Sequence, residues 1–108
     1  MRILTLLLAL MSSLVAHAST GEPEFARETV RLVRQDCGSC HGMSLQGGLG
    51  TPLTREALAG QSAEALAVII LHGKHGTAMP PWKSLLSAPQ AQWIAERLLE
   101  GFPEEKQP

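Results

Sequence analysis

The run Cys37-Gly38-Ser39-Cys40-His41 constrains this chain more than any other stretch. Two cysteines three positions apart, with histidine directly after the second, form the C-x-x-C-H pattern of covalent c-type haem attachment. Each thiol must add to one vinyl group of the same macrocycle, and residues three apart in the first turn of a helix face the same way. The histidine then points at the iron as its proximal ligand. The pattern predicts one covalent haem, attached at Cys37 and Cys40 and bound by His41.

Two other interpretations of the cysteine pair stay open. A thiol redox motif would belong to a thioredoxin-like βαβ chain, whose strands are rich in β-branched and aromatic residues. This chain has no Tyr and only 2 Phe, and its apolar residues recur at helical spacing. A structural disulfide or half of a zinc site is the other alternative. Zinc would need a second pair of ligands, and the chain has only these 2 cysteines.

Residues 1–18 have the features of a secretory signal: a basic residue, an apolar run and the small-x-small sequence Ala16-His17-Ala18. We expect cleavage after Ala18, which leaves residues 19–108 as one mature domain in the periplasm, where c-type haem is attached. The apolar run is too short for a stable membrane span, so we expect no span after cleavage. An uncleaved N-terminal anchor is the alternative.

A mature chain of this size buries little apolar surface and needs a further source of stability. A haem linked at two cysteines would serve as both cross-link and core, so we expect the haem-free chain to fold poorly. The full chain has 9 basic and 10 acidic side chains, and one basic residue lies in the signal, which leaves a net charge near −2. The absence of a basic stripe argues against nucleic acid as a partner. We expect a monomer.

Apolar residues at helical spacing predict an all-α fold of about four helices. The predicted helices cover residues 23–36, 55–59, 63–72 and 87–101. Ser87 and Gln90 form a capping box at the start of the last helix. Arg34 and the other arginines of the first helix take its solvent side. Residues 102–108 are expected to form a frayed acidic tail.

The iron of a low-spin electron carrier needs a second axial ligand on the other haem face. Met43 lies two residues after His41 and cannot readily reach across the ring. Met79 lies 38 residues downstream of His41 in a loop stiffened by two prolines, so we predict Met79 as the distal ligand. The alternatives are ligation by His72 or His75, with Met79 as a packing residue.

The order of these features resembles the class I cytochromes c: a helix, C-x-x-C-H, a glycine-rich loop with proline, and Met-Pro before a terminal helix. Three stretches narrow the resemblance: residues 37–50, Thr77-Ala78-Met79-Pro80-Pro81-Trp82, and Trp93-Ile94-Ala95-Glu96-Arg97-Leu98. They resemble the NirC-type cytochromes, short periplasmic proteins encoded beside the cytochrome cd nitrite reductase of denitrifying bacteria. The resemblance covers essentially the whole mature chain, with no departure at the ligand positions.

The resemblance implies a class I cytochrome c fold around one haem c, which the c-type cytochrome maturation machinery attaches at Cys37 and Cys40. It implies His41 and Met79 as the axial ligands. In cytochromes c a proline in the glycine-rich loop offers its carbonyl oxygen to the proximal imidazole N–H, and Pro52 lies at that place. The implied redox partner is the nitrite reductase, which would receive electrons. The alternative is an accessory electron acceptor in biosynthesis of the reductase's d-type haem.

Outer-sphere electron transfer needs no acid, base or nucleophile, and the sequence shows no catalytic constellation. An iron with both axial positions filled has no open site for a substrate, so we expect a carrier and not an enzyme. No acidic residue lies between Glu64 and Glu96, while two lysines and two histidines lie there around Met79. They predict a mildly basic collar at the haem edge, with an ordinary solvated loop as the alternative.

Overall fold

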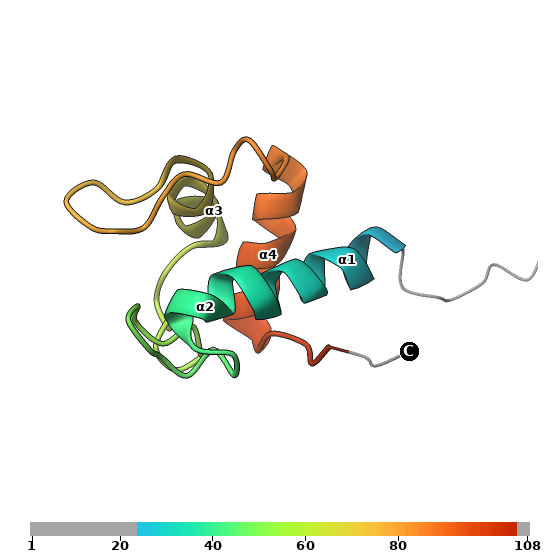
Figure 1. The fold of residues 1–108 in the computed structure, drawn as a ribbon, viewed down its shortest axis with the longest axis horizontal. Helices are drawn as coiled ribbons and strands as arrows, with labels where there is room; N and C mark the ends of the chain where they lie inside the picture. Colours follow the sequence, from blue (N-terminus) through green and yellow to red (C-terminus); the bar gives the residue numbers. More distant parts are fainter. Residues whose placement is uncertain (1–23, 106–108) are drawn as a thin grey trace, which may run out of the picture.

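The computed structural model describes residues 24–105, which are drawn in colour in Figure 1. The predicted signal over residues 1–18 and its cleavage site lie outside this range. Residues 24–105 are helical and contain no strand, which confirms the all-α class. No helix in the described part of the chain is long and apolar enough to cross a membrane.

The first element is a continuous helical run from Glu24 to His41. It consists of α1 (Glu24–Leu32), a π-helix η1 (Val33–Cys37) and α2 (Gly38–His41). The run extends past the predicted end of the first helix, so the C-x-x-C-H segment closes a helix and does not open one. Gly42 ends the run because its φ of 90° lies in the region that favours glycine.

Two further helices lie where the sequence predicts them: α3 spans Ala63–His72 and α4 spans Ala88–Glu100. Ser62 Oγ accepts a hydrogen bond at 3.1 Å from an N–H in the first turn of α3. At α4, the Gln90 N–H donates to Ser87 Oγ at 3.2 Å and the Ser87 N–H donates to Gln90 Oε1 at 2.9 Å. These caps satisfy N–H groups that a helix leaves unpaired, which is why both starts are readable from the sequence.

The predicted short helix over residues 55–59 is wrong, because this segment makes turns. The Leu58 N–H donates to the Thr54 carbonyl at 3.0 Å, and the Thr54 hydroxyl accepts a second N–H at 3.2 Å. A single turn of helix does not compensate for the free energy that helix nucleation costs. In addition, Gly60 has φ 84°, which lies outside the helical region. The described residues therefore form three helical bodies, the run from 24 to 41, α3 and α4.

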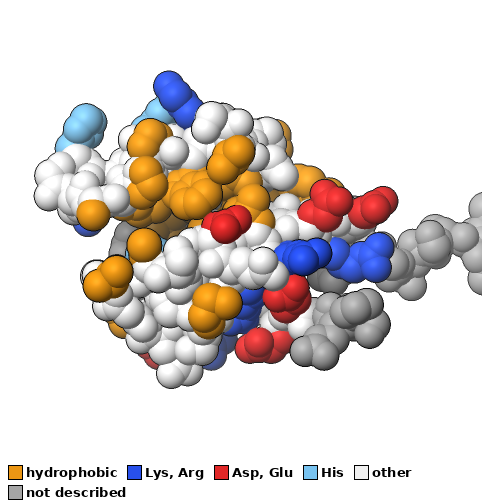
Figure 2. Space-filling model, in the orientation of Figure 1, with side chains coloured by type: hydrophobic (Ala, Val, Ile, Leu, Met, Phe, Trp, Pro, Cys, Tyr) orange, Lys and Arg blue, Asp and Glu red, His pale blue; other side chains and the backbone are white. Residues whose placement is uncertain are grey.

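The hydrophobic core lies mainly where α3 packs against α4 (Figure 1). Ile94 on α4 and Val33 on η1 are among its most deeply buried side chains. Burying one such side chain contributes about 1.5–3 kcal/mol. The buried members of the core are Val33, Leu45, Leu58, Leu66, Ala67, Ile70, Leu86, Ala91, Ile94, Ala95 and Leu98. Figure 2 shows further hydrophobic side chains at the surface, along the seam between the helical run and the segments around α3.

Aromatic edges join α4 to α1 and to the chain end. The Trp93 ring on α4 lies 6.1 Å from the Phe25 ring on α1, with the planes 77° apart. On its other side it lies 6.2 Å from the Phe102 ring, at 84°. Such T-shaped pairs contribute about 0.5–1.5 kcal/mol each beyond the area they bury. They hold the segment after α4 across the first helical run.

Two predictions are wrong. Arg34 does not face solvent, and residues 102–105, the described part of the predicted frayed tail, are bound to it. Arg34 is 7% exposed. Its Nη2 donates to the carbonyls of Phe102 at 3.0 Å and Pro103 at 2.9 Å, and its Nε donates to Pro103 at 3.1 Å. Nη2 also lies 3.4 Å from a carboxylate oxygen of Glu104. The packing of Phe102 beside α4 turns these carbonyls toward η1, where only a long side chain with several donors reaches both.

Candidate haem site

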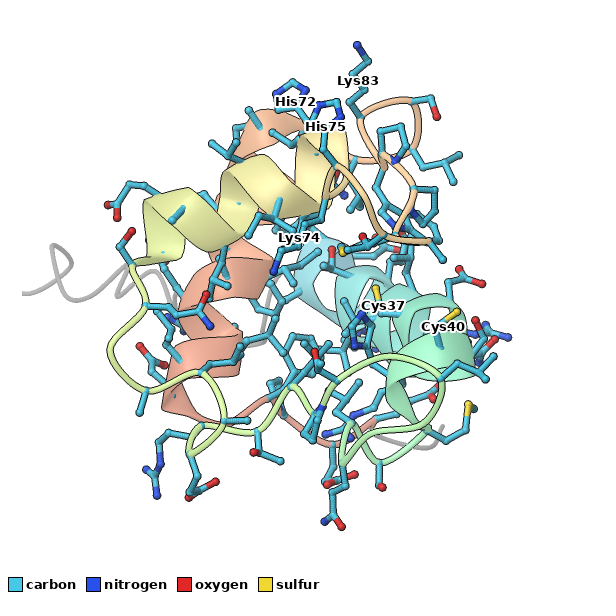
Figure 3. The ribbon with its side chains drawn as sticks, turned by 90° about the vertical axis from the view of Figure 1, so that its left-hand side faces the viewer. Cys37, Cys40, His72, Lys74, His75 and Lys83 are labelled. Carbon is cyan, nitrogen blue, oxygen red and sulfur yellow. The ribbon has the colours of Figure 1, made fainter. Side chains whose placement is uncertain are left out.

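The π-helix η1 sets the direction in which the two cysteines point. A π-helix closes i→i+5 hydrogen bonds, so the residues after it are rotated relative to a continuous α-helix. Here the Gly38 N–H donates to the Val33 carbonyl, five residues back. Cys37 and Cys40 follow at the end of the run, and Figure 3 shows both at the same edge of it. Both thiols therefore lie at one edge of the helical run, where a single macrocycle can reach them.

Both cysteines are free thiols, with Cys40 exposed and Cys37 partly buried. Burial, and after it the neighbouring carboxylate of Asp36, raises the pKa of the Cys37 thiol to about 11. The Cys37 thiol is therefore neutral at pH 7. A thiol redox motif needs a cysteine whose pKa is lowered, so this environment does not fit that alternative.

One ring nitrogen of His41 is engaged by the backbone. Nδ1 lies 2.7 Å from the carbonyl oxygen of Thr51. Since a carbonyl only accepts hydrogen bonds, Nδ1 carries the proton and donates it. In the neutral imidazole this places the lone pair on Nε2, which is the form of imidazole that binds a metal. The same bond holds the ring in one orientation.

The prediction that Pro52 supplies this carbonyl is wrong, because the acceptor belongs to Thr51, the residue before it. The proline ring packs against the loop instead, and a Cβ built on Gly47 would lie 3.2 Å from Pro52 Cγ. Pro52 still contributes, because a proline restricts the preceding residue to extended backbone and so directs the Thr51 carbonyl. In the sequence, a residue followed by proline, as in Thr51-Pro52, therefore indicates which carbonyl accepts the hydrogen bond.

The glycine-rich loop wraps closely around the imidazole. The Gly47 N–H donates to the His41 carbonyl at 2.8 Å, and the Gly50 N–H donates to the Cys40 carbonyl at 2.7 Å. A Cβ on Gly50 would lie 2.9 Å from His41 Nδ1, which is closer than a Cβ atom can approach without a shift. Glycine at position 50 therefore lets the loop backbone lie directly against the His41 ring.

Backbone hydrogen bonds fasten the loop of Met79 to the end of α3. The Met79 carbonyl accepts from the Lys74 N–H at 3.4 Å, and the Met79 N–H donates to Thr77 Oγ1 at 3.4 Å. Beyond the two prolines, the Trp82 N–H donates to the Ile70 carbonyl at 3.1 Å. The Met79 side chain is partly buried and packs against the core. The loop is therefore tied to the fold on both sides of Met79.

The three other candidates for the distal ligand do not share the partly buried position of Met79 beside the core. Met43 is 62% exposed and follows directly on the end of the helical run. His72 and His75 are exposed, and Figure 3 shows both at an outer edge, away from Cys37 and Cys40. This arrangement favours Met79 as the distal ligand over each of the three.

The residues present fit a covalently bound haem. Two free thiols lie at one edge, and the His41 ring next to them keeps an unprotonated nitrogen. Partly buried apolar side chains beside the core would pack against a flat apolar ring; they include Leu32, Leu53, Leu71 and Trp82. Within residues 24–105 no three His, Cys, Asp or Glu side chains lie close enough together to hold a metal ion. This part of the chain therefore lacks the further ligands that a zinc site at the two cysteines would need.

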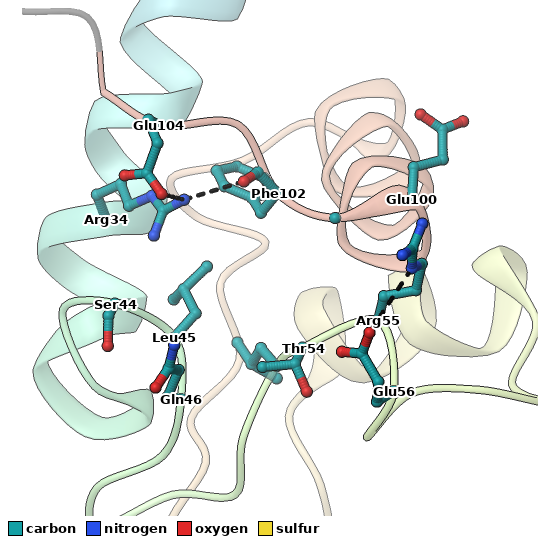
Figure 4. A pocket seen from close by; sticks show the side chains of 12 residues that line it. Arg34, Ser44, Leu45, Gln46, Thr54, Arg55, Glu56, Glu100, Phe102 and Glu104 are labelled. Carbon is teal, nitrogen blue, oxygen red and sulfur yellow. Dashed lines mark hydrogen bonds and ion pairs between the residues drawn. The ribbon is translucent and has the colours of Figure 1, made fainter.

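A separate cavity of about 280 Å³ lies beside the C-terminal segment (Figure 4). Polar and charged side chains from the loop after α2, from residues 53–56 and from the chain end line it. None of the predicted haem-site residues does. Arg34 and Arg55 in its wall are each within ion-pair distance of a glutamate, so their charges are compensated. The cavity therefore lies apart from the predicted attachment and ligand residues, and it shares only Leu53 with the apolar side chains named above.

Known proteins share this arrangement. Residues 24–96 match the family model described as cytochrome C oxidase, cbb3-type, subunit III. Cytochrome c55X of Paracoccus denitrificans (strain Pd 1222) is 53% identical over 96 residues, which cover 86% of this chain and 93% of that protein. The solved structure of c-type cytochrome NirC is 48% identical, with a TM-score of 0.71, and the match covers 73% of this chain and 93% of that one. This chain belongs to the NirC-like class I cytochromes c.

As a NirC-like cytochrome c, the chain carries one covalently attached haem c, takes part in electron transport and works with a redox partner. The class I fold and the cofactor predicted from the sequence are thereby confirmed. A more distant likeness is to the dihydro-heme d1 dehydrogenase NirN in complex with DHE. It is 32% identical with a TM-score of 0.62, and the match covers 71% of this chain but 17% of that protein. The likeness to NirN is thus confined to one segment of it.

Proposed function

We propose that this NirC-like cytochrome is a periplasmic electron carrier and not an enzyme. Cys37 and Cys40 hold the haem by thioether bonds, and His41 and Met79 are the axial ligands of the iron. One observation carries the proposal: the hydrogen bond from His41 Nδ1 to the Thr51 carbonyl, at 2.7 Å. It leaves the Nε2 lone pair available to bind iron, next to the two cysteines.

The haem, when bound, supplies an iron that alternates between the ferric and ferrous states. The residues of the chain keep the accompanying rearrangement small. The Thr51 carbonyl holds the His41 ring, and the bonds from Lys74 and Thr77 hold the backbone of Met79. If His41 and Met79 both bound the iron, no position would remain for a substrate, and the haem would serve to pass electrons to a partner protein.

The proposed electron acceptor is cytochrome cd nitrite reductase in denitrification. The similarity to NirC and to cytochrome c55X supports this partner, because the sequence resembles cytochromes encoded beside that reductase. In this proposal residues 1–18 direct export and are removed. Residues 19–108 then receive haem from the c-type cytochrome maturation machinery and act as a monomer.

A second candidate function is an accessory electron acceptor in biosynthesis of d-type haem. The likeness to a segment of dihydro-heme d1 dehydrogenase supports it. Deletion of the gene separates the two functions. If the protein is the donor, the reductase keeps its d-type haem but is reduced slowly. If the protein is the accessory acceptor, the purified reductase lacks d-type haem. A deletion strain with normal nitrite reduction and a fully loaded reductase would refute both.

The substitution Met79→Ala tests the distal ligand. We expect loss of the weak methionine-to-iron absorption at the red end of the ferric spectrum. We also expect a lower reduction potential, because a thioether stabilises ferrous iron. Met43→Ala is the matched control and should change neither. An unchanged spectrum in Met79→Ala, with loss of ligation in His72→Ala or His75→Ala, would assign bis-histidine ligation instead.

A further inference from the structure

Positive groups gather around the loop that carries Met79. His72, Lys74, His75 and Lys83 are all exposed, and we refer to these four residues as the distal basic surface. Figure 3 shows His72, His75 and Lys83 together on the outer side of α3, while Lys74 extends on the opposite side of that helix, toward the centre of the view. The two lysines carry positive charge, and histidine is a further side chain that can do so.

No neighbouring carboxylate offsets this charge. The sequence has no acidic residue between Glu64 and Glu96. All ion pairs among the described residues involve arginines, so within that part of the chain neither Lys74 nor Lys83 has a carboxylate within 4.0 Å. On the face drawn in Figure 2, most carboxylates lie over the α1 side of the molecule, and the histidines lie at the opposite end. The molecule therefore presents an electric dipole with its positive end at the Met79 loop.

The distal basic surface is tied to the proposed iron ligand. The Lys74 N–H donates to the Met79 carbonyl at 3.4 Å, and the Lys83 N–H donates to the Leu71 carbonyl at 3.1 Å. Gly73 is so close that a Cβ there would lie 2.7 Å from the Met79 carbonyl oxygen. A protein docked on this surface therefore rests against the loop that carries the distal ligand, which shortens the path for an electron.

Exposed apolar side chains accompany the charges. Val68 is 57% exposed and lies four residues before His72, so the two share one face of α3. Leu85 is 65% exposed and lies two residues after Lys83. Apolar side chains within a charged surface provide the short-range contact that follows electrostatic encounter.

We propose that the distal basic surface is the docking site for a carboxylate-rich surface of the redox partner. The inference rests on the proposed function and adds the face that is used and the charge of the partner's face. Long-range attraction orients the molecular dipole and raises the association rate, while the apolar contacts complete the encounter complex. Dissolved salt screens the attraction, so the association rate must fall as ionic strength rises.

The test is electron transfer from the haem-loaded protein to purified cytochrome cd nitrite reductase over a salt series. In Lys74→Glu/Lys83→Glu we expect the second-order rate constant at low salt to fall by on the order of tenfold or more, with a flatter salt dependence. Arg27→Glu/Arg55→Glu is the matched control, because it makes the same change in net charge at exposed residues elsewhere. It should stay within about twofold of the wild type. Equal losses in both double variants would overturn the proposal.

Two small redox ions separate this inference from the choice of partner. Ferricyanide is an anionic oxidant, and hexaammineruthenium is cationic. In Lys74→Glu/Lys83→Glu we expect slower oxidation by ferricyanide and faster reaction with the cation, with neither change in the control. If wild type does not reduce the nitrite reductase but these shifts occur, the proposed partner is wrong and the location of the docking face stands. If the shifts are absent, the proposed docking face is wrong, whichever protein is the partner.

Discussion

At the scale of single residues, the site depends on how the backbone approaches His41. The Thr51 carbonyl fixes the tautomer of the imidazole, and Gly50 lies against the same nitrogen. A hydrogen bond donated by Nδ1–H makes the opposite nitrogen more electron-rich, which strengthens a ligand bond to iron and influences the reduction potential. The ligand chemistry therefore depends on two residues that bind no haem themselves.

The substitution Gly50→Ala tests this dependence. Its Cβ would lie 2.9 Å from His41 Nδ1, so the ring or the loop must move. We expect the free energy of unfolding to fall by about 1–3 kcal/mol, together with a shifted reduction potential and an altered ferric spectrum. A redox titration and a denaturant titration of the haem-loaded protein measure both effects.

Gly60→Ala is the control for strain alone. Gly60 has φ 84° and no heavy atom within 4 Å of a built Cβ. It should cost about 1–2 kcal/mol of stability and leave the potential unchanged. A potential in Gly50→Ala equal to that of the wild type would show that the loop does not act on the imidazole.

At the scale of secondary structure elements, the first helical run is fastened to the rest of the molecule at η1. The π-helix turns Cys37 and the residues after it to one edge, and Arg34 within η1 binds the carbonyls of the C-terminal segment. The Arg34 guanidinium also lies 5.6 Å from the centre of the Phe102 ring. The segment after α4 therefore positions the helix that carries the C-x-x-C-H motif.

Removal of the contact between Arg34 and the segment after α4 should destabilise the fold. In Arg34→Ala the carbonyls of Phe102 and Pro103 lose their buried donors, and we expect the free energy of unfolding to fall by about 2–4 kcal/mol. Denaturation of the haem-loaded protein, followed by far-ultraviolet circular dichroism, measures it.

Arg31→Ala is the control on the same helical run. Its side chain is 71% exposed and lies 4.0 Å from a Glu105 oxygen, so we expect a change within about 0.5 kcal/mol. Similar losses for the two substitutions would contradict a specific role for Arg34.

At the scale of the whole molecule, the protein core is small. Only 13 hydrophobic residues are buried in the described part of the chain, and most lie between α3 and α4. The helical run meets α4 and the chain end through aromatic edges and Arg34, and hydrophobic side chains remain at the surface along its seam with the α3 region (Figure 2). A chain this short with such a core needs a covalent cofactor as part of its interior.

The substitution pair Cys37→Ala/Cys40→Ala should therefore prevent stable folding. Without thioether bonds the haem is not retained, and we expect low helicity and no cooperative thermal transition. Circular dichroism of the purified protein measures both. Ser39→Ala, between the two cysteines, should keep haem and fold. A colourless double variant that melts cooperatively with native helicity would show that the protein core is sufficient.

Features that depend on neighbouring residues can be predicted from the sequence. The C-x-x-C-H motif, the start of α3 at Ser62 and the capping box at Ser87 and Gln90 each involve groups a few positions apart. The same holds for the restriction that Pro52 places on the backbone of Thr51, although the prediction names the carbonyl of Pro52 and the structure shows that of Thr51. Interactions of this range follow from backbone geometry, and the surrounding fold changes them little.

Contacts between distant segments depend on the three-dimensional fold and could not be predicted from the sequence. Arg34 lies in a helix whose other arginines are exposed, and its burial depends on a chain end 68 and 69 residues away. The described part of the predicted tail is ordered for the same reason. The short helix expected over residues 55–59 is replaced by turns around the buried Leu58. Local propensity is worth a few tenths of a kcal/mol per residue, so burial and buried hydrogen bonds, at about 1–3 kcal/mol each, prevail over it.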